Sequence, residues 1–175
     1  MFSPFTLELL AKIWKHKFLP PRIKAFAWRL IRHALSTGNR AARFSSKIDN
    51  TCKFCGSLET DFHLFFQCNF SRAVWFYANP SLRTDMLPYE DDGVQGTLQL
   101  LLQNNFFDDL LQELLTRLWY LWKARNDFRF NNKQWSIQKI WHEINADIQS
   151  STLFSMQGMV LSSARAWIQN GFSAS

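Results

Sequence analysis

The chain has 175 residues, 47% of them hydrophobic and including 8 Trp and 17 Phe, which excludes a disordered chain and allows a real core. No apolar run reaches the roughly 18 residues of a membrane span, and no charged start followed by an apolar block marks a secretory signal. The net charge of +6 is uneven, because residues 1–50 carry ten Lys and Arg against two acids whereas residues 51–118 carry four against nine.

Helical periodicity dominates the sequence, and no convincing strand pattern is present. The first helix is expected over residues 5–16, with Leu7, Leu10, Ala11 and Trp14 at helical spacing. Its cap is Ser3 or Thr6, and Pro20-Pro21 separates it from the next helix. Further helices are expected over residues 39–44, from Thr60 past His63, from Ser71, and over 97–104, 108–126, 135–150 and 152–170, with a loop over 80–96 and a break over 125–133.

The clearest amphipathic helix is predicted over residues 22–35. One face carries the apolar residues Ile23, Phe26, Ala27, Leu30, Ile31 and Ala34, and the opposite arc carries Arg22, Arg29, Arg32 and His33 beside Trp28. Such a basic arc with an aromatic is typical of nucleic-acid surfaces, and equally of a solvated helix face.

The helix over 108–126 is expected to be central, because it presents a broad stripe of Leu and Trp. The predicted fold is therefore all-α, a multi-helix bundle with a small CCHC zinc-binding insertion near the middle of the N-terminal half. The expected division is a zinc-binding region over residues 1–80, a loop over 81–96, and a helical region over 97–175 that packs on the first.

All three cysteines of the protein lie in one short stretch, in the pattern C-x2-C-x7-H-x4-C formed by Cys52, Cys55, His63 and Cys68. Three thiolates and one imidazole suit one tetrahedral Zn²⁺ ion, and four protein ligands leave no open position for a catalytic water. Because His63 and Cys68 are five residues apart, about 140° around an α-helix, Cys68 is expected at or past a helix end.

Other interpretations of this cluster are weaker. Three buried free thiols and a solvated histidine are the plainest alternative, and a disulfide would leave one odd cysteine. A redox C-x-x-C motif lacks the βαβ context in which such motifs occur.

Several segments together resemble the zinc-binding domain that follows the polymerase in reverse transcriptases of plant LINE-type (non-LTR) retrotransposons. They are residues 13–15 (IWK), 20–30 (PPRIKAFAWRL), 35–39 (LSTGN), 52–56 (CKFCG), 59–68 (ETDFHLFFQC) and 73–75 (AVW). Residues 122–133 (WKARNDFRFNNK) are similar to the linker before the ribonuclease H region of such polyproteins. The resemblance implies a module that grips RNA or DNA without the polymerase activity.

No catalytic constellation is visible, so the chain is not expected to be an enzyme or to bind a small-molecule substrate. The run Tyr89-Glu90-Asp91-Asp92 imitates a polymerase signature, but it is expected in a loop without the strands and carboxylates that two Mg²⁺ ions need. The nucleic-acid backbone is expected to contact Arg22, Lys24, Trp28, Arg29, Arg32, Arg40, Arg43 and Lys53.

A protein-interaction or adaptor module with a structural zinc is the alternative function. It is favoured by the aromatic content and the acidic middle of the chain. Zinc thiolates are consistent with the nucleus or cytoplasm. The basic, acid-poor start imitates a mitochondrial presequence, although a folded first helix is the preferred interpretation.

Overall fold

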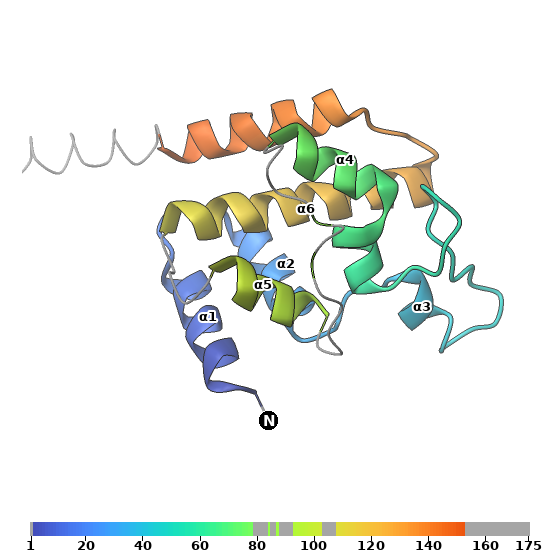
Figure 1. Ribbon diagram of the computed structural model, residues 1–175, viewed down its shortest axis with the longest axis horizontal. Coiled ribbons are helices and arrows are strands. Elements are labelled where there is room, and N and C mark those ends of the chain that lie inside the picture. Colours follow the sequence, from blue (N-terminus) through green and yellow to red (C-terminus); the bar gives the residue numbers. More distant parts are fainter. Residues whose placement is uncertain (1, 79–83, 85–86, 88–92, 103–107, 153–175) are drawn as a thin grey trace, which may run out of the picture.

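The computed structural model describes residues 2–78, 84, 87, 93–102 and 108–152, and these residues are mostly helical (Figure 1). The elements are α1 (Pro4–Lys15), α2 (Pro21–Ile31), α3 (Gly38–Ala41), the π-helical turn η1 (His63–Gln67), α4 (Asn69–Ala78), α5 (Val94–Leu102), α6 (Asp108–Asn131) and a last helix over 137–152. Within this part of the chain the pairing of extended backbone is limited to a Thr51–Leu58 bridge. The all-α prediction is confirmed.

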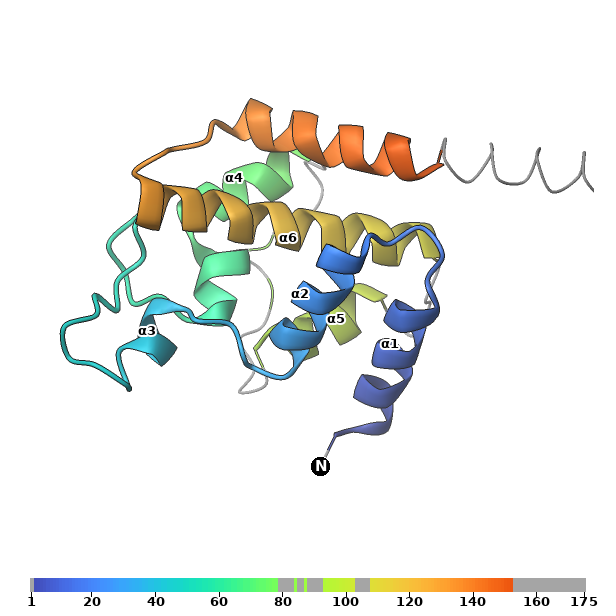
Figure 2. The same ribbon diagram turned by 180° about the vertical axis from the view of Figure 1, so that it is seen from behind.

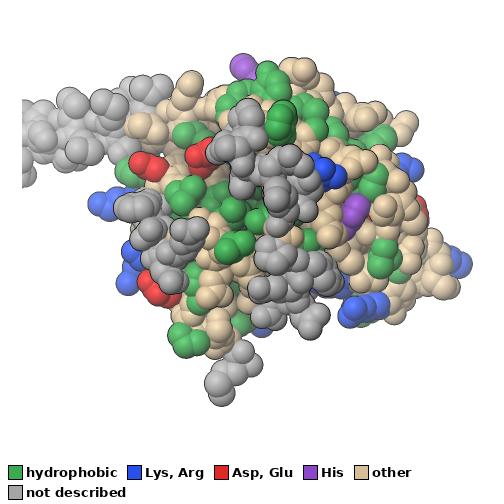
Figure 3. Space-filling model, viewed as in Figure 1, with side chains coloured by type: hydrophobic (Ala, Val, Ile, Leu, Met, Phe, Trp, Pro, Cys, Tyr) green, Lys and Arg blue, Asp and Glu red, His purple; other side chains and the backbone are tan. Residues whose placement is uncertain are grey.

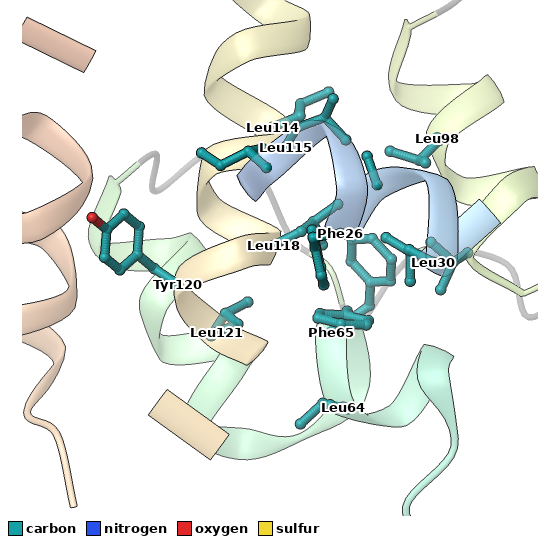
Figure 4. Packing of buried hydrophobic residues seen from close by; sticks show 14 of the residues in the cluster. Phe26, Leu30, Leu64, Phe65, Leu98, Leu114, Leu115, Leu118, Tyr120 and Leu121 are labelled. Carbon is teal, nitrogen blue, oxygen red and sulfur yellow. The ribbon is translucent and has the colours of Figure 1, made fainter. Parts of the chain in front are cut away.

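Helix α6 is the centre of the bundle, as the apolar stripe predicts. Helices α2 and η1 pack against it, and the helix over 137–152 runs back along it (Figures 1 and 2). Phe26 of α2 lies among side chains of α6 and η1 (Figure 4), with its ring centroid 5.5 Å from that of Trp119 and 6.1 Å from that of Phe65. One hydrophobic core therefore joins residues from both halves of the chain.

Helix α1 begins where predicted, because the Ser3 hydroxyl accepts a hydrogen bond from the Thr6 amide at 3.1 Å. Its predicted apolar face is wrong. The side chains buried in the bundle are Thr6, Leu9 and Ile13, whereas Leu7 and Trp14 are more than half exposed. The helix has two apolar stripes, and periodicity alone does not say which of them meets the core.

Helix α2 ends at Ile31, four residues before the predicted end. His33 takes a left-handed backbone with φ 51°, the Ala34 amide donates to the Arg29 carbonyl at 2.8 Å, and the His33 amide donates to that of Leu30 at 3.1 Å. These bonds form a Schellman cap, in which glycine is the usual left-handed residue. As a consequence Ala34, predicted to face the core, is exposed, whereas the other five predicted core residues of this helix are buried.

Other boundaries also move. Helix α4 begins at Asn69, so Ser71 is inside the helix and its hydroxyl donates to the Leu64 carbonyl instead of capping. Helix α5 begins at Val94 within the predicted loop, and α3 is a single turn that ends at Ala41. Helix α6 continues through the predicted break to Asn131. The predicted helix over 152–170 and the acidic run over 89–92 lie outside the described residues, except for residue 152.

No helix within the described ranges has the length and apolar character that crossing a membrane requires.

Gly38 marks the closest approach of α3 to the chain that enters the zinc motif. A Cβ atom at this position would lie 2.9 Å from both the carbonyl carbon and the carbonyl oxygen of Asn50. We expect Gly38→Ala to lower the free energy of unfolding by about 1–3 kcal/mol, since backbone must move to admit the methyl group. Urea denaturation measures this change, and Ala42→Ser, half-buried just after the same turn, is the control. A G38A protein as stable as the wild type would contradict the close approach.

Candidate metal centre

The first two cysteines lie on a tight loop closed by the Thr51–Leu58 bridge. The Cys52 amide donates to the Ser57 carbonyl at 2.6 Å, and the Gly56 amide donates to the Cys52 carbonyl at 2.8 Å. Gly56 has φ +80°, a conformation that other residues rarely adopt, and this explains the glycine directly after the second cysteine. The loop turns the Cys52 and Cys55 side chains toward one point.

The other two ligand residues lie at the two ends of η1. The Thr60 hydroxyl accepts a hydrogen bond from the His63 amide at 3.0 Å, so Thr60 caps the helical turn that was predicted to start here. The Cys68 amide donates to the His63 carbonyl at 2.7 Å, a bond that spans five residues. Cys68 itself has left the helix, with φ −58° and ψ 135°. The π turn explains how two ligands five residues apart reach one ion. Its wider coil brings Cys68 back to the side of the helix on which His63 lies.

The four ligand atoms form a compact cluster in which every pair lies within 4.8 Å. The Sγ atoms of Cys52 and Cys68 are 3.8 Å apart, and Cys55 Sγ is 3.2 Å from His63 Nε2. A tetrahedral zinc ion with bonds of about 2.3 Å to sulfur and 2.0 Å to nitrogen separates its ligands by roughly 3.5–3.8 Å. Cys52, Cys55, His63 and Cys68 therefore form a compact site for one zinc ion.

The four side chains are coupled electrostatically. The hydrogen bond with Cys68 raises the pKa of the Cys52 thiol to about 12, and the same bond lowers the pKa of Cys68. Hydrogen bonding with Cys52 raises the pKa of His63. Thiolates and neutral imidazole are the forms that bind zinc, so uptake of the ion releases protons from this cluster.

The metal site is buried on the side that faces the bundle and open to solvent at Cys55. Cys52 and Cys68 are buried, Cys55 is exposed, and His63 is half-buried. Phe54, between the two loop cysteines, stacks on Phe70 with ring centroids 4.2 Å apart and lies 5.4 Å from Phe128 of α6. The aromatic and leucine residues of the motif belong to the core: Phe62, Leu64, Phe65 and Phe66 are buried.

A buried ion pair ties the zinc region to α6. The Arg125 guanidinium pairs with the Glu59 carboxylate, and both side chains are at most 1% exposed. Glu59 Oε1 also accepts a hydrogen bond from the Gly38 amide at 2.6 Å, while Arg125 Nη2 donates to the Ser36 carbonyl at 3.2 Å. One helical turn later, Arg129 donates to the carbonyls of Thr51 and Asp49. We call Glu59, Arg125 and Arg129 the clamp.

Sequence reasoning missed the clamp. Its signal is an arginine that continues the apolar stripe of α6, because Leu118, Leu121 and Arg125 follow one another at helical spacing and all three are buried. A charged residue at such a position requires a buried partner, although the spacing does not identify it.

Residues 5–75 match a family model described as zinc-binding in reverse transcriptase. The matched segment contains all four ligand residues and extends from α1 into α4, so the match and the geometry point to the same site. Neither the search of curated proteins nor that of solved structures found a match. We refer to residues 5–75 as the reverse-transcriptase-type zinc-binding region.

The predicted nucleic-acid residues of the zinc-binding region fall into two groups. Three of them contact other parts of the chain: Arg22 pairs with Asp147 at 2.6 Å, Lys24 donates to the Trp14 carbonyl at 3.0 Å, and Arg40 pairs with Asp61 at 3.0 Å. The remaining five, all of them exposed, are Trp28, Arg29 and Arg32 on α2, Arg43 after α3, and Lys53 on the zinc loop.

These exposed residues are spread along the molecule. Figure 2 shows α2 on the near face and α3 with the zinc loop at one end. In the opposite view, Figure 3, Lys and Arg side chains gather near α1 and near α3 and the zinc loop. Two of them contact each other on α2, where the Arg32 guanidinium lies 4.6 Å from the centroid of the Trp28 ring.

Proposed function

We propose that the chain is a non-catalytic, zinc-stabilised module that binds RNA or DNA through the exposed surface of α2. The observation that carries this proposal is the exposed trio Trp28, Arg29 and Arg32 on one helix, with one guanidinium stacked on the indole. Guanidinium groups pair with phosphates and an exposed indole stacks on a base, so the trio combines both contacts. Arg43 and Lys53 extend the basic surface toward the zinc loop.

Zinc has a structural role in this proposal. Four protein ligands complete its coordination, and no position is left for an activated water. The ion would hold the loop of Cys52 and Cys55 against η1 and, through the clamp, against α6. The zinc ion therefore supplies no chemistry to a substrate, and it fixes the helices that carry the binding surface.

We further infer an origin in a plant LINE-type retroelement, supported by the motif segments at residues 13–15, 20–30 and 59–68. A nuclear or cytoplasmic location fits reduced zinc thiolates.

A protein partner is the second candidate, favoured by exposed aromatics on another helix. Phe76 and Tyr77 of α4 are 53% and 51% exposed, next to each other in the chain. Adjacent exposed aromatics are typical of the centres of protein interfaces.

Removal of the α2 charges tests the nucleic-acid proposal. We expect Arg29→Gln/Arg32→Gln to weaken binding of single-stranded RNA roughly tenfold to thirtyfold at 0.1 M salt, and to reduce the slope of log K against log salt by about 1.4. Fluorescence anisotropy across a salt series measures both quantities. The control Lys123→Gln/Lys133→Gln removes equal charge from exposed positions on and after α6 and should leave both unchanged. Equal losses in the two double variants would contradict a specific role of α2.

A further inference from the structure

A shallow depression lies between α1 and α2. Its volume is about 370 Å³, and it is lined by Trp14, Ala25, Trp28 and Arg29. The two indole rings come from different helices, and their exposed fractions are 53% and 37%. Figure 2 shows α1 and α2 side by side on the face that α2 presents to solvent.

The second apolar stripe of α1 creates this depression. Leu9 and Ile13 are the residues of α1 that pack into the core. Trp14 therefore projects from the bundle, with about half of its surface in water. The Lys24 ammonium donates to the Trp14 carbonyl at 3.0 Å, and this bond ties the end of α1 to α2. Trp14 and Trp28 therefore place two exposed indoles from neighbouring helices beside one depression.

The charges around the depression select its ligand. Arg29 lies in the wall, Arg32 stacks on Trp28 at 4.6 Å from the ring centroid, and the Lys24 ammonium lies beside Trp14. The sequence from residue 1 to residue 48, which forms both helices, contains a single acidic residue, Glu8. Flat apolar walls with several cations at the rim are complementary to a planar ring that carries an anion nearby, which is the chemistry of a nucleotide.

We propose that the depression seats one unpaired base of a single-stranded nucleic acid. The base contacts the indoles of Trp14 and Trp28, and Arg29 and Arg32 pair with the flanking phosphates. This inference rests on the proposed function and adds to it Trp14 as a binding residue and a preference for single strands. In a duplex the bases are paired and stacked on one another, so a duplex offers phosphates to the arginines but no base to the depression.

The preference is tested by anisotropy with a fluorescein-labelled 12-nucleotide RNA and with a blunt duplex of the same length. We expect Trp14→Leu and Trp28→Leu to weaken binding of the single strand roughly fivefold to a hundredfold, the range of base–aromatic stacking, and to leave duplex binding unchanged. Phe130→Leu, which removes an aromatic that is 71% exposed on α6, is the matched control and should bind both as the wild type does. Far-UV circular dichroism and zinc content confirm that each variant is folded.

Intrinsic fluorescence gives a second, independent measurement. Stacking of a base on an indole quenches its emission, so unlabelled single-stranded RNA should quench the wild type more than it quenches the milder variants Trp14→Phe and Trp28→Phe.

Three outcomes would overturn the inference, and they are distinguishable. If Trp14→Leu binds the single strand as tightly as the wild type while Arg29→Gln/Arg32→Gln does not, the base site is wrong and the proposed function stands. If Trp14→Leu loses single strand and duplex equally, the indole supports the charged surface and seats no base. If the folded wild type binds neither oligonucleotide, the proposed function fails together with the base site.

Discussion

Cys52→Ser and His63→Ala are each expected to abolish stable zinc binding and to unfold residues 45–78. In small zinc sites the binding free energy is folding free energy, on the order of 10 kcal/mol. Here the buried Cys52 and Cys68 lie on separate elements, and the loop that carries Cys52 is closed by one short bridge, so loss of zinc removes the bonds that join this loop to the π turn. Native mass spectrometry should find one zinc in the wild type and none in either variant. Thermal unfolding should occur at a markedly lower temperature in both variants and in the chelated wild type.

Gln67→Ala is the control for this experiment, because Gln67 is exposed and directly precedes the ligand Cys68. It should keep both the metal and the wild-type unfolding temperature. If either ligand variant, or the wild type after chelation, unfolded at the same temperature as the zinc-loaded wild type, a stabilising role of zinc would be wrong.

Arg125→Met is expected to lower the free energy of unfolding by about 3–5 kcal/mol. The substitution removes the closest cation of the Glu59 carboxylate, which is 0% exposed, and leaves it with the Gly38 amide at 2.6 Å and the Arg129 guanidinium at 3.9 Å. A buried carboxylate that has lost its closest cation costs far more than the packing that methionine restores. Urea denaturation followed by circular dichroism measures the loss, and Glu59→Gln/Arg125→Met should recover part of it because the buried charge is removed.

Arg22→Met is the matched comparison for the clamp. Arg22 also pairs with a carboxylate through two contacts of 2.6 Å, to Asp147, but its side chain is 49% exposed. Water screens such a pair, so its loss should cost about 1 kcal/mol or less. An Arg125→Met variant no less stable than Arg22→Met would show that burial of the clamp does not matter to the fold.

The zinc ligands were predictable from the sequence because their chemistry is local. Cys52 and Cys55 converge through one tight loop, and His63 and Cys68 through one turn of helix, so spacing alone specifies the set. The central position of α6 was predictable for a similar reason, since its stripe of leucines is too broad for a helix that faces solvent.

Contacts between distant segments were not predictable in this way. Glu59 and Arg125 are 66 residues apart, and nothing in the local pattern of either segment names the other. The same limit explains the break expected after Arg125. The polar residues after Arg125 suggested a loop. In the structure α6 continues to Asn131, and Arg129 on this last part donates a hydrogen bond to the Thr51 carbonyl at the start of the zinc loop.

The face of α1 illustrates a different limit. Leu7 and Trp14 have the spacing of a core face, as Leu9 and Ile13 also do, and the choice between them depends on how the rest of the bundle closes. The end of α2 depends on a histidine in a conformation that glycine usually supplies, so no residue-type signal marked it.

The position of the clamp has a consequence for how this region can be inherited. Glu59 lies inside the segment that matches the family model, whereas Arg125 and Arg129, the two cations that pair with it, lie fifty residues or more beyond its end. A recombination event that transferred residues 5–75 alone would carry a carboxylate without its cation, and Phe26 without the leucines of α6. The segment that keeps both the clamp and the packing of Phe26 therefore runs from α1 through α6, well past the end of the family match at residue 75.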